Sequence, residues 1–145
     1  MIEALNILVA LLMRFEGCRL TAYRDIVGVL TIGWGETLGV TEGMVWTQEH
    51  ADEQLRQRAA QFMVATLKRC PALYLETPER IAACASLAYN IGVGAFGASS
   101  VSRFTMQQRF ATAADAFLMW KMAAGRVIQG LLNRRIIERL KYLEL

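Results

Sequence analysis

Three residues near the start of the chain, Glu16, Asp25 and Thr31, have side chains that could together break a glycosidic bond. Cleaving an acetal needs an acid that protonates the leaving oxygen, and a carboxylate on the other side that attacks or activates water. The glutamate and the aspartate supply the two carboxyl groups. A threonine hydroxyl can hold a water because it both donates and accepts hydrogen bonds. The segment EGCRLTAYRDIVGVLTIGWG, residues 16–35, therefore contains one candidate catalytic set.

Each of these residues also has an ordinary structural explanation. A glutamate at a helix end is usually solvated, and an aspartate shortly before a glycine usually forms a turn. A threonine in a strand is usually present for its β-propensity. The catalytic interpretation depends on elements that bring the three side chains together.

The first of these elements is an N-terminal helix. Apolar residues recur at helical spacing through Ile2–Phe15. This helix should end near Gly17, because glycine is common at C′, the position just past the end of a helix. Glu16 then lies where a helix meets a β region, and such junctions are where clefts form.

The second element is a hairpin in the only glycine-rich, β-branched part of the chain. We expect Thr21–Tyr23 to pair with Val29–Trp34 across a reversal at residues 24–28. This pairing places Asp25 and Thr31 side by side on opposite arms.

The rest of the chain is expected to be helical. Thr47 can cap a long helix that ends before Pro71, and Thr77-Pro78 is a strong start signal for a buried central helix that ends at Gly92. Shorter helices are predicted over residues 100–109, 111–124 and 132–143. The fold class is therefore α+β, with one domain over residues 1–145: a small β-lobe at about 17–46, a helical lobe of residues 1–16 and 47–145, and a cleft between them.

Composition excludes several classes of protein. The 145 residues are 54% hydrophobic and 20% charged with 2 Pro, which excludes a disordered chain. The longest apolar run, Ile7–Met13, is far shorter than the roughly 20 residues of a membrane span, and the N-terminus does not resemble a standard signal peptide. A net charge of +3 is a mild bias toward anionic partners.

The cysteines and the histidine do not suggest a metal site. Cys18, Cys70 and Cys84 lack CxxC and Cys/His metal spacing, and an odd number of cysteines fits a reducing compartment. We expect free thiols, with a Cys70–Cys84 disulfide as the alternative. His50 lies in a polar helical stretch and is expected at the surface.

Three segments of the chain resemble segments of the phage-type lysozymes, the endolysins of glycoside hydrolase family 24, and they follow one another in the order found in that family. The first is FEGCRLTAYRD with TIGWG, which carries the spacing of Glu16, Asp25 and Thr31. The second is ASLAYNIGVGAF, residues 85–96, and the third is residues 120–138 with GRVIQGLLNRR inside it. The likeness covers nearly the whole chain.

The resemblance implies a catalytic role for each member of the set. It makes Glu16 the general acid, with Asp25 and Thr31 positioning a water for attack on the anomeric carbon, which implies inversion. The substrate would be the β-1,4 bond between N-acetylmuramic acid and N-acetylglucosamine in bacterial peptidoglycan. Tyr23 would support the hairpin or the sugar below the cut.

Residues of the second and third segments would bind the substrate or support the catalytic residues. Tyr89 and Asn90 match a helix face that lines the sugar cleft, although Asn90 could instead cap its helix. Arg134 is expected to pair with Glu16, with Arg135 as the alternative. No metal or cofactor is implied, nor any nucleic-acid partner. The family resemblance further implies a monomer that resides in the host cytoplasm until lysis and then acts on the cell wall.

One position departs from the family pattern, and two other functions compete. Glu36 stands where the family usually has histidine after TIG-aromatic-Gly. The Glu36 carboxylate therefore either raises the pKa of a nearby acid or points to solvent. The first competing function is that of a lytic transglycosylase, which would use one acid and form an anhydro sugar. A membrane-disrupting protein would need a basic, polar helix face, and residues 2–13 have only Glu3 and Asn6 as polar groups.

Overall fold

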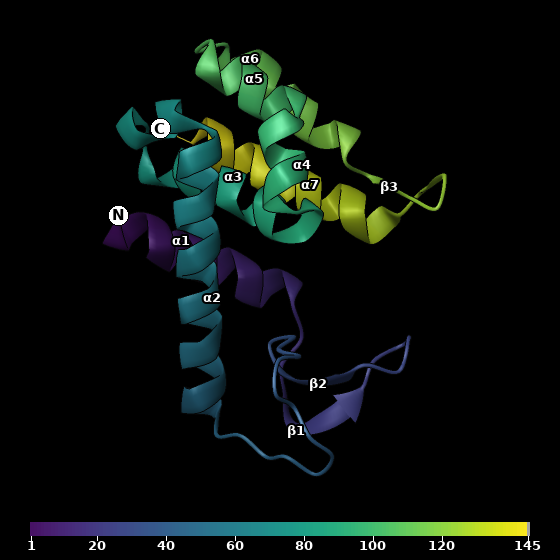
Figure 1. The fold of residues 1–145 in the computed structure, drawn as a ribbon. Helices are drawn as coiled ribbons and strands as arrows, with labels where there is room; N and C mark the ends of the chain where they lie inside the picture. The colour runs from purple at the N-terminus through teal and green to yellow at the C-terminus, as the bar shows by residue number, and fades with distance from the viewer. Residues whose placement is uncertain (145) are drawn as a thin grey trace.

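The computed structural model describes residues 1–144. Its helices and strands are shown in Figure 1. The helices are α1 (Ile2–Phe15), α2 (Gln48–Arg69), α3 (Pro78–Ile91), α4 (Val93–Ala98), α5 (Ser100–Met106), α6 (Phe110–Ala116) and α7 (Gln129–Leu143), with 3-10 turns at Pro71–Leu75 and Phe117–Met119. The strands are β1 (Arg19–Arg24), β2 (Leu30–Gly33), β3 (Met122–Ala123) and β4 (Arg126–Val127).

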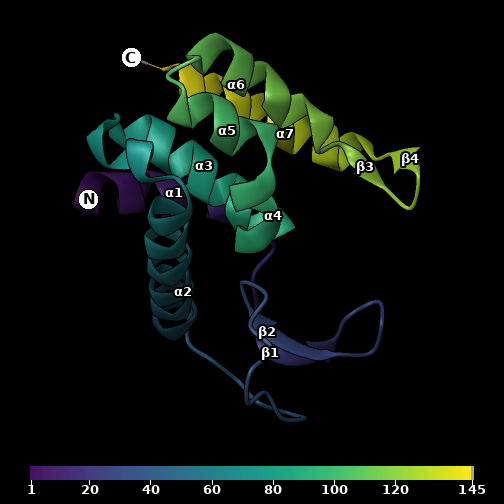
Figure 2. The same ribbon diagram turned by 45° about the horizontal axis from the view of Figure 1, so that its top comes forward.

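The elements form a helical cluster and a separate β region. Helices α1 and α3 to α7 gather at one end of the molecule, while β1 and β2 lie at the other, and α2 runs between the two (Figures 1 and 2). This arrangement confirms the predicted α+β class, with a small β region and a mainly helical part.

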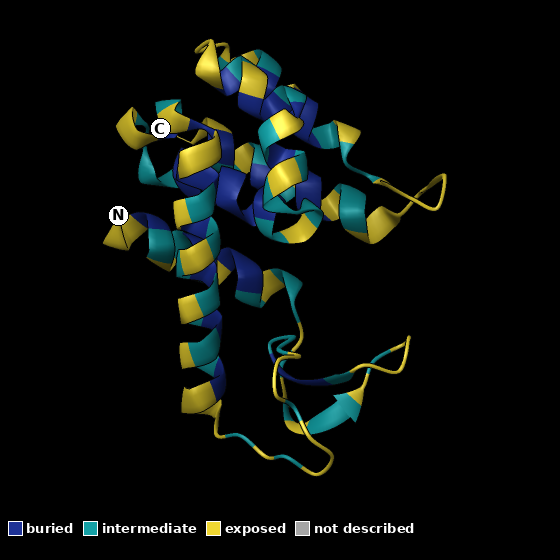
Figure 3. Ribbon diagram, in the orientation of Figure 1, coloured by how far each residue is buried: buried dark blue, intermediate teal, exposed yellow. Residues whose placement is uncertain are grey.

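Helix α3 is the buried centre of the helical cluster, as predicted. Every residue from Arg80 to Ala88 is buried, and Figure 3 shows α3 as almost continuously buried. The helix begins where Thr77 accepts a hydrogen bond from the backbone N–H of Arg80 and Pro78 occupies the first turn. Its small side chains let α1, α2 and α7 approach closely.

Helix α1 ends at Phe15, close to the predicted end at Gly17. Its buried side chains, Ala4, Leu8, Leu11 and Leu12, follow the helical period and pack into the core. Glu16 already has extended backbone angles, with φ −98° and ψ 145°. With Glu16 as the C-cap, Gly17 is the C′ residue, as predicted, although it does not have the positive φ that a C′ glycine often takes.

The predicted hairpin is confirmed. Strands β1 and β2 pair antiparallel, with Tyr23 opposite Thr31 and Arg24 opposite Leu30. Gly28 takes a left-handed φ of 87° in the connecting turn, which a side chain would disfavour. The following loop is pinned back on β1, since the N–H of Ala22 donates to the carbonyl of Met44 at 2.8 Å.

The C-terminal third differs from the prediction of helices alone. The expected helix over 111–124 stops at Ala116, and residues 122–127 form the β3–β4 hairpin instead. Ala124 and Gly125 both have positive φ, 50° and 75°, which makes a two-residue turn of the type that hairpins favour. The alanine-rich sequence concealed this turn because alanine normally favours helix.

Smaller differences concern boundaries. Helix α4 is not predicted at all, α5 ends at Met106 rather than near residue 109, and α7 begins at Gln129 rather than Leu132. Gly92, with φ of 96°, separates α3 from α4 and is the predicted end of α3. Short helices of this kind carry too few residues for a clear periodic pattern.

Three further predictions concern single residues and the membrane. All three cysteines are free, Cys70 and Cys84 are buried, and the disulfide alternative is therefore wrong. His50 is exposed as predicted, with its ring edge-on to Trp46 at 4.6 Å between centroids. Within residues 1–144, none of the helices is both long and apolar enough to cross a bilayer.

Candidate active site

The Glu16 carboxylate lies at the end of α1 and contacts a cation from α7. Arg134 Nη1 donates to Glu16 Oε1 at 3.2 Å, and the Glu16 side chain is 32% exposed. The predicted contact of Arg134 with Glu16 is therefore present. The Glu16 side chain therefore retains access to solvent.

Arg134 is held on several sides. Its Nη2 donates to the carbonyl of Ser86 at 3.1 Å, and its Nε to Glu138 Oε2 at 3.4 Å. The guanidinium also lies 4.6 Å from the centre of the Phe15 ring. A guanidinium presents its donors in a rigid fork, so these contacts fix the direction of the N–H that reaches Glu16.

Glu138 is the buried hub behind Arg134, and the sequence analysis missed it. Its carboxylate is fully buried, accepts a short hydrogen bond from Ser86 Oγ, and lies 2.6 Å from Arg135 Nε. Burial raises the pKa of Glu138, opposed by Arg135, Ser86 and Arg134, while burial lowers the pKa of Arg135. The available signal was its spacing of three and four residues after the two arginines.

Arg135 points away from Glu16, so the alternative pairing is wrong. Its Nη1 donates to Asn90 Oδ1 at 2.9 Å and to the carbonyl of Trp120 at 3.4 Å. Asn90 is exposed on α3 and does not cap the helix, since Gly92 takes that position. The Arg135 contact instead fixes the orientation of the Asn90 amide.

Asp25 and Thr31 both bind the backbone of Val29. Asp25 Oδ1 accepts from the N–H groups of Val27 at 3.0 Å and Val29 at 2.8 Å. Thr31 Oγ1, on a residue that is 5% exposed, donates to the carbonyl of Val29 at 2.9 Å. Asp25, just after β1, and Thr31, on β2, therefore contact the same backbone residue, but Thr31 lies opposite Tyr23 and not opposite Asp25 as predicted. The Thr31 hydroxyl proton is already used in its hydrogen bond to Val29.

The two tyrosines of the candidate set lie on different elements. Tyr23 pairs with Thr31 across the hairpin, and the Arg19 guanidinium lies 4.2 Å from the centre of its ring. Tyr89, on α3, packs against Phe62 with ring centroids 4.8 Å apart. Burial raises the pKa of Tyr89 to about 12.

Glu36, the departure from the family pattern, is paired. Its Oε2 lies 3.4 Å from Arg58 Nη1 and its side chain is 15% exposed, so the solvent-pointing alternative is wrong. Arg58 Nη1 also donates to the carbonyl of Gly35 at 3.1 Å. The same guanidinium lies 5.0 Å from the centre of the Tyr89 ring, so α2 joins the β region to α3 at this point.

Glu16 and Asp25 provide a pair of carboxyl groups, the residue type that most glycoside hydrolases use. The chain matches the Phage lysozyme family over residues 13–138. The endolysin of Salmonella phage P22 is 40% identical over 139 residues, which cover 91% of this chain and 92% of that endolysin.

Other relatives match over similar parts of the chain. The endolysin of Bacillus phage PZA is 35% identical over 132 residues, 89% of this chain and 50% of that protein, so the chain spans about half the length of this relative. The solved muramidase domain of SpmX from Asticaccaulis excentricus is 31% identical, with a TM-score of 0.84 and 95% of each chain covered. The chain therefore belongs to the phage lysozyme family, a family of glycoside hydrolases.

Proposed function

We propose that this chain is a muramidase that hydrolyses the β-1,4 bond between N-acetylmuramic acid and N-acetylglucosamine in bacterial peptidoglycan. The observation that carries the proposal is the Glu16–Arg134 contact at 3.2 Å, because it gives the partly exposed acid a defined partner from another helix. The family likeness to endolysins supports the substrate.

In this mechanism Glu16 protonates the oxygen of the leaving sugar. The carboxylate that remains is negative, and the adjacent Arg134 guanidinium stabilises that charge. Because Arg134 is held by Ser86 and Glu138, it is oriented before the reaction begins. Preorganised donors of this kind need no rearrangement as charge develops.

Asp25 and Thr31 position the attacking water. The Thr31 hydroxyl donates to the carbonyl of Val29, so toward a water it acts as an acceptor. A water that donates one hydrogen to Thr31 and the other to the Asp25 carboxylate directs its lone pair at the anomeric carbon. Asp25 then accepts the proton of that water, and attack from the face opposite the leaving group inverts the configuration.

The remaining predicted residues bind the sugar or support the site. Tyr89 and Asn90 line the sugar site, with Asn90 oriented by Arg135, and Tyr23 supports the hairpin below the cut. Residues 1–145 act as one monomeric lysozyme domain. The enzyme would reside in the host cytoplasm until lysis and act on the cell wall.

Two alternatives are less well supported. A lytic transglycosylase needs no group to hold water, whereas the Asp25 and Thr31 side chains both bind the backbone of Val29 here. Membrane disruption by α1 would require its apolar face, and Leu8 and Leu12 are fully buried in the core.

Turbidity loss of chloroform-treated bacterial cells tests the proposal. Glu16→Gln is expected to lower the rate by about 10²–10⁴-fold, the usual contribution of a general acid. Asp25→Asn keeps an amide oxygen for the two turn N–H groups but removes the charge, and it should lose activity with the fold intact. Glu3→Gln, an exposed change on the same helix as the acid, is the control. Undiminished lysis by Glu16→Gln would refute the proposal.

A further inference from the structure

The β3–β4 hairpin projects from the helical cluster and is exposed along its whole length. Figures 1 and 2 both show it extending beyond the helices that precede and follow it, α6 and α7. Every residue from 122 to 130 is exposed. The hairpin contains none of the residues to which a catalytic or sugar-binding part is assigned above.

The two faces of this hairpin differ in chemistry. Met122 lies opposite Val127, and Ala123 lies opposite Arg126. Opposed residues of an antiparallel pair share a face, and successive residues alternate between the faces. One face is therefore apolar, formed by Met122 and Val127. The other face carries Arg126 and, two residues before Ala123, Lys121.

Positive charge accumulates in this part of the chain. Residues 100–145 contain eight lysines and arginines but three acidic residues, whereas residues 1–99 contain eight and ten, so the positive excess lies in the C-terminal third. The three acidic side chains all pair with arginine or lysine side chains of α7. Lys121 and Arg126 have no ion-pair partner among residues 1–144.

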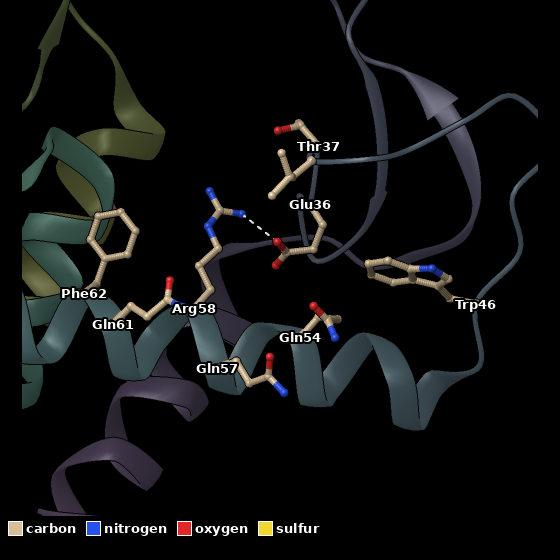
Figure 4. Close-up of a pocket in the computed structure, with 9 residues that line it drawn as sticks. Glu36, Thr37, Trp46, Gln54, Gln57, Arg58, Gln61 and Phe62 are labelled. Atoms are coloured by element: carbon tan, nitrogen blue, oxygen red, sulfur yellow. Dashed lines mark ion pairs between the residues drawn. The ribbon is translucent and has the colours of Figure 1, made fainter.

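Cations beside two other exposed segments are neutralised. Figure 4 shows the Arg58 guanidinium of α2 directed at Glu36 in the loop after β2, with 3.4 Å between Nη1 and Oε2. At the β1–β2 turn, where Ile26 is fully exposed, Arg24 pairs with Glu42 at 2.7 Å. The β3–β4 hairpin differs because its exposed apolar side chains lie next to cations that are still available to a partner.

An apolar face combined with available cations fits the surface of an anionic bilayer. Apolar side chains enter the boundary between headgroups and acyl chains, and nearby Lys and Arg are attracted to the lipid phosphates. Because basic side chains have long flexible stems, they reach the headgroups from the opposite face of a narrow hairpin. A soluble polyanion would engage Lys121 and Arg126 but would leave Met122 and Val127 in water.

We propose that the β3–β4 hairpin binds the surface of a bilayer that contains anionic phospholipids. The contact is peripheral: the hairpin enters the headgroup region and does not cross the bilayer. It requires the apolar face and the two cations together. This inference is independent of the proposed muramidase activity, since neither its residues nor its ligand takes part in bond cleavage.

Cosedimentation of the full chain with lipid vesicles tests the proposal. Vesicles of equal parts phosphatidylcholine and phosphatidylglycerol should bind the protein, and vesicles of phosphatidylcholine alone should bind it far more weakly. Lys121→Gln with Arg126→Gln should weaken binding to the anionic vesicles about thirtyfold, the loss expected for two cations near such a surface. Val127→Ser should weaken it about fivefold, because less apolar area leaves water.

Matched controls make the same changes on other elements. Lys68→Gln with Arg109→Gln removes two exposed cations, at the end of α2 and just before α6. Val64→Ser, on α2, replaces a valine that is 47% exposed, against 53% for Val127. Both controls should bind the anionic vesicles like the parent, and circular dichroism checks that every variant is folded.

Three results would overturn the inference. The first is no binding of the parent to anionic vesicles, and the second is equal binding of the hairpin variants and their controls. The third is a loss for Lys121→Gln with Arg126→Gln without any loss for Val127→Ser, which would indicate a site for a soluble polyanion. The vesicles contain no peptidoglycan, so each result is separate from the lysis assay of the proposed function.

Discussion

Replacement of Glu138 by glutamine should destabilise the protein strongly, although this residue contacts no solvent. Glu138 is the only carboxylate within residues 1–144 that pairs with both Arg134 and Arg135, whose side chains are 8% and 0% exposed. Removing one partner of a buried ion pair typically costs about 3–5 kcal/mol, because an uncompensated charge stays buried. At about 2–4 °C per kcal/mol for a chain near this size, the melting temperature should fall by roughly 10 °C.

The matched control is Glu144→Gln, at the C-cap of the same helix. Lys141 and Glu144 form an ion pair with the same spacing of three residues and a distance of 2.7 Å, but Glu144 is 50% exposed. Exposed pairs contribute about 0–1 kcal/mol, so this variant should melt within a few degrees of the parent. Thermal unfolding by circular dichroism measures both. Equal melting temperatures for the two variants would refute the assignment of Glu138 as the buried hub.

Three further predictions concern burial and backbone conformation. Because burial raises the Tyr89 pKa to about 12, the neutral Tyr89 side chain contributes stability that is present below pH 10 and lost as pH rises toward 12. In urea unfolding, the free energy of unfolding of Tyr89→Phe should therefore fall less between pH 10 and 12 than that of the parent. Burial also raises the pKa of Cys70 and Cys84, so a thiol reagent should label both only after unfolding; rapid labelling of the native protein at either would contradict this. Gly33→Ala places a Cβ 2.9 Å from an indole carbon at φ 64° and should cost about 1 kcal/mol or more in urea unfolding, whereas Gly17→Ala, in open space, should cost less.

The sequence predicted the elements that have strong local signals. The cap at Thr77 and the apolar period of α1 specify those helices without reference to the rest of the chain. The turn at residues 24–28 likewise specified a hairpin, although its register places Tyr23, and not Asp25, opposite Thr31. Each of these features depends on residues close together in the sequence.

The remaining features depend on distant contacts. Which of two adjacent arginines reaches Glu16 depends on how α7 is rotated against α1, and no local pattern encodes that rotation, so Arg134 is predicted from the family resemblance and not from its neighbours in the sequence. The partner of Glu36, Arg58, is 22 residues away and is brought near only when the loop after β2 packs on α2. The left-handed conformation of Ala124 is likewise imposed by the surrounding structure.

The central claim is that water, held by Asp25 and Thr31, attacks the anomeric carbon while Glu16 acts as the acid. Proton NMR of a peptidoglycan digest, recorded within the first minutes and before mutarotation, tests it most directly. Inverting hydrolysis of a β-bond predicts that the new reducing ends appear first as the α-anomer. A β-anomer as the first product, or anhydro sugar ends without a reducing anomer, would contradict the account.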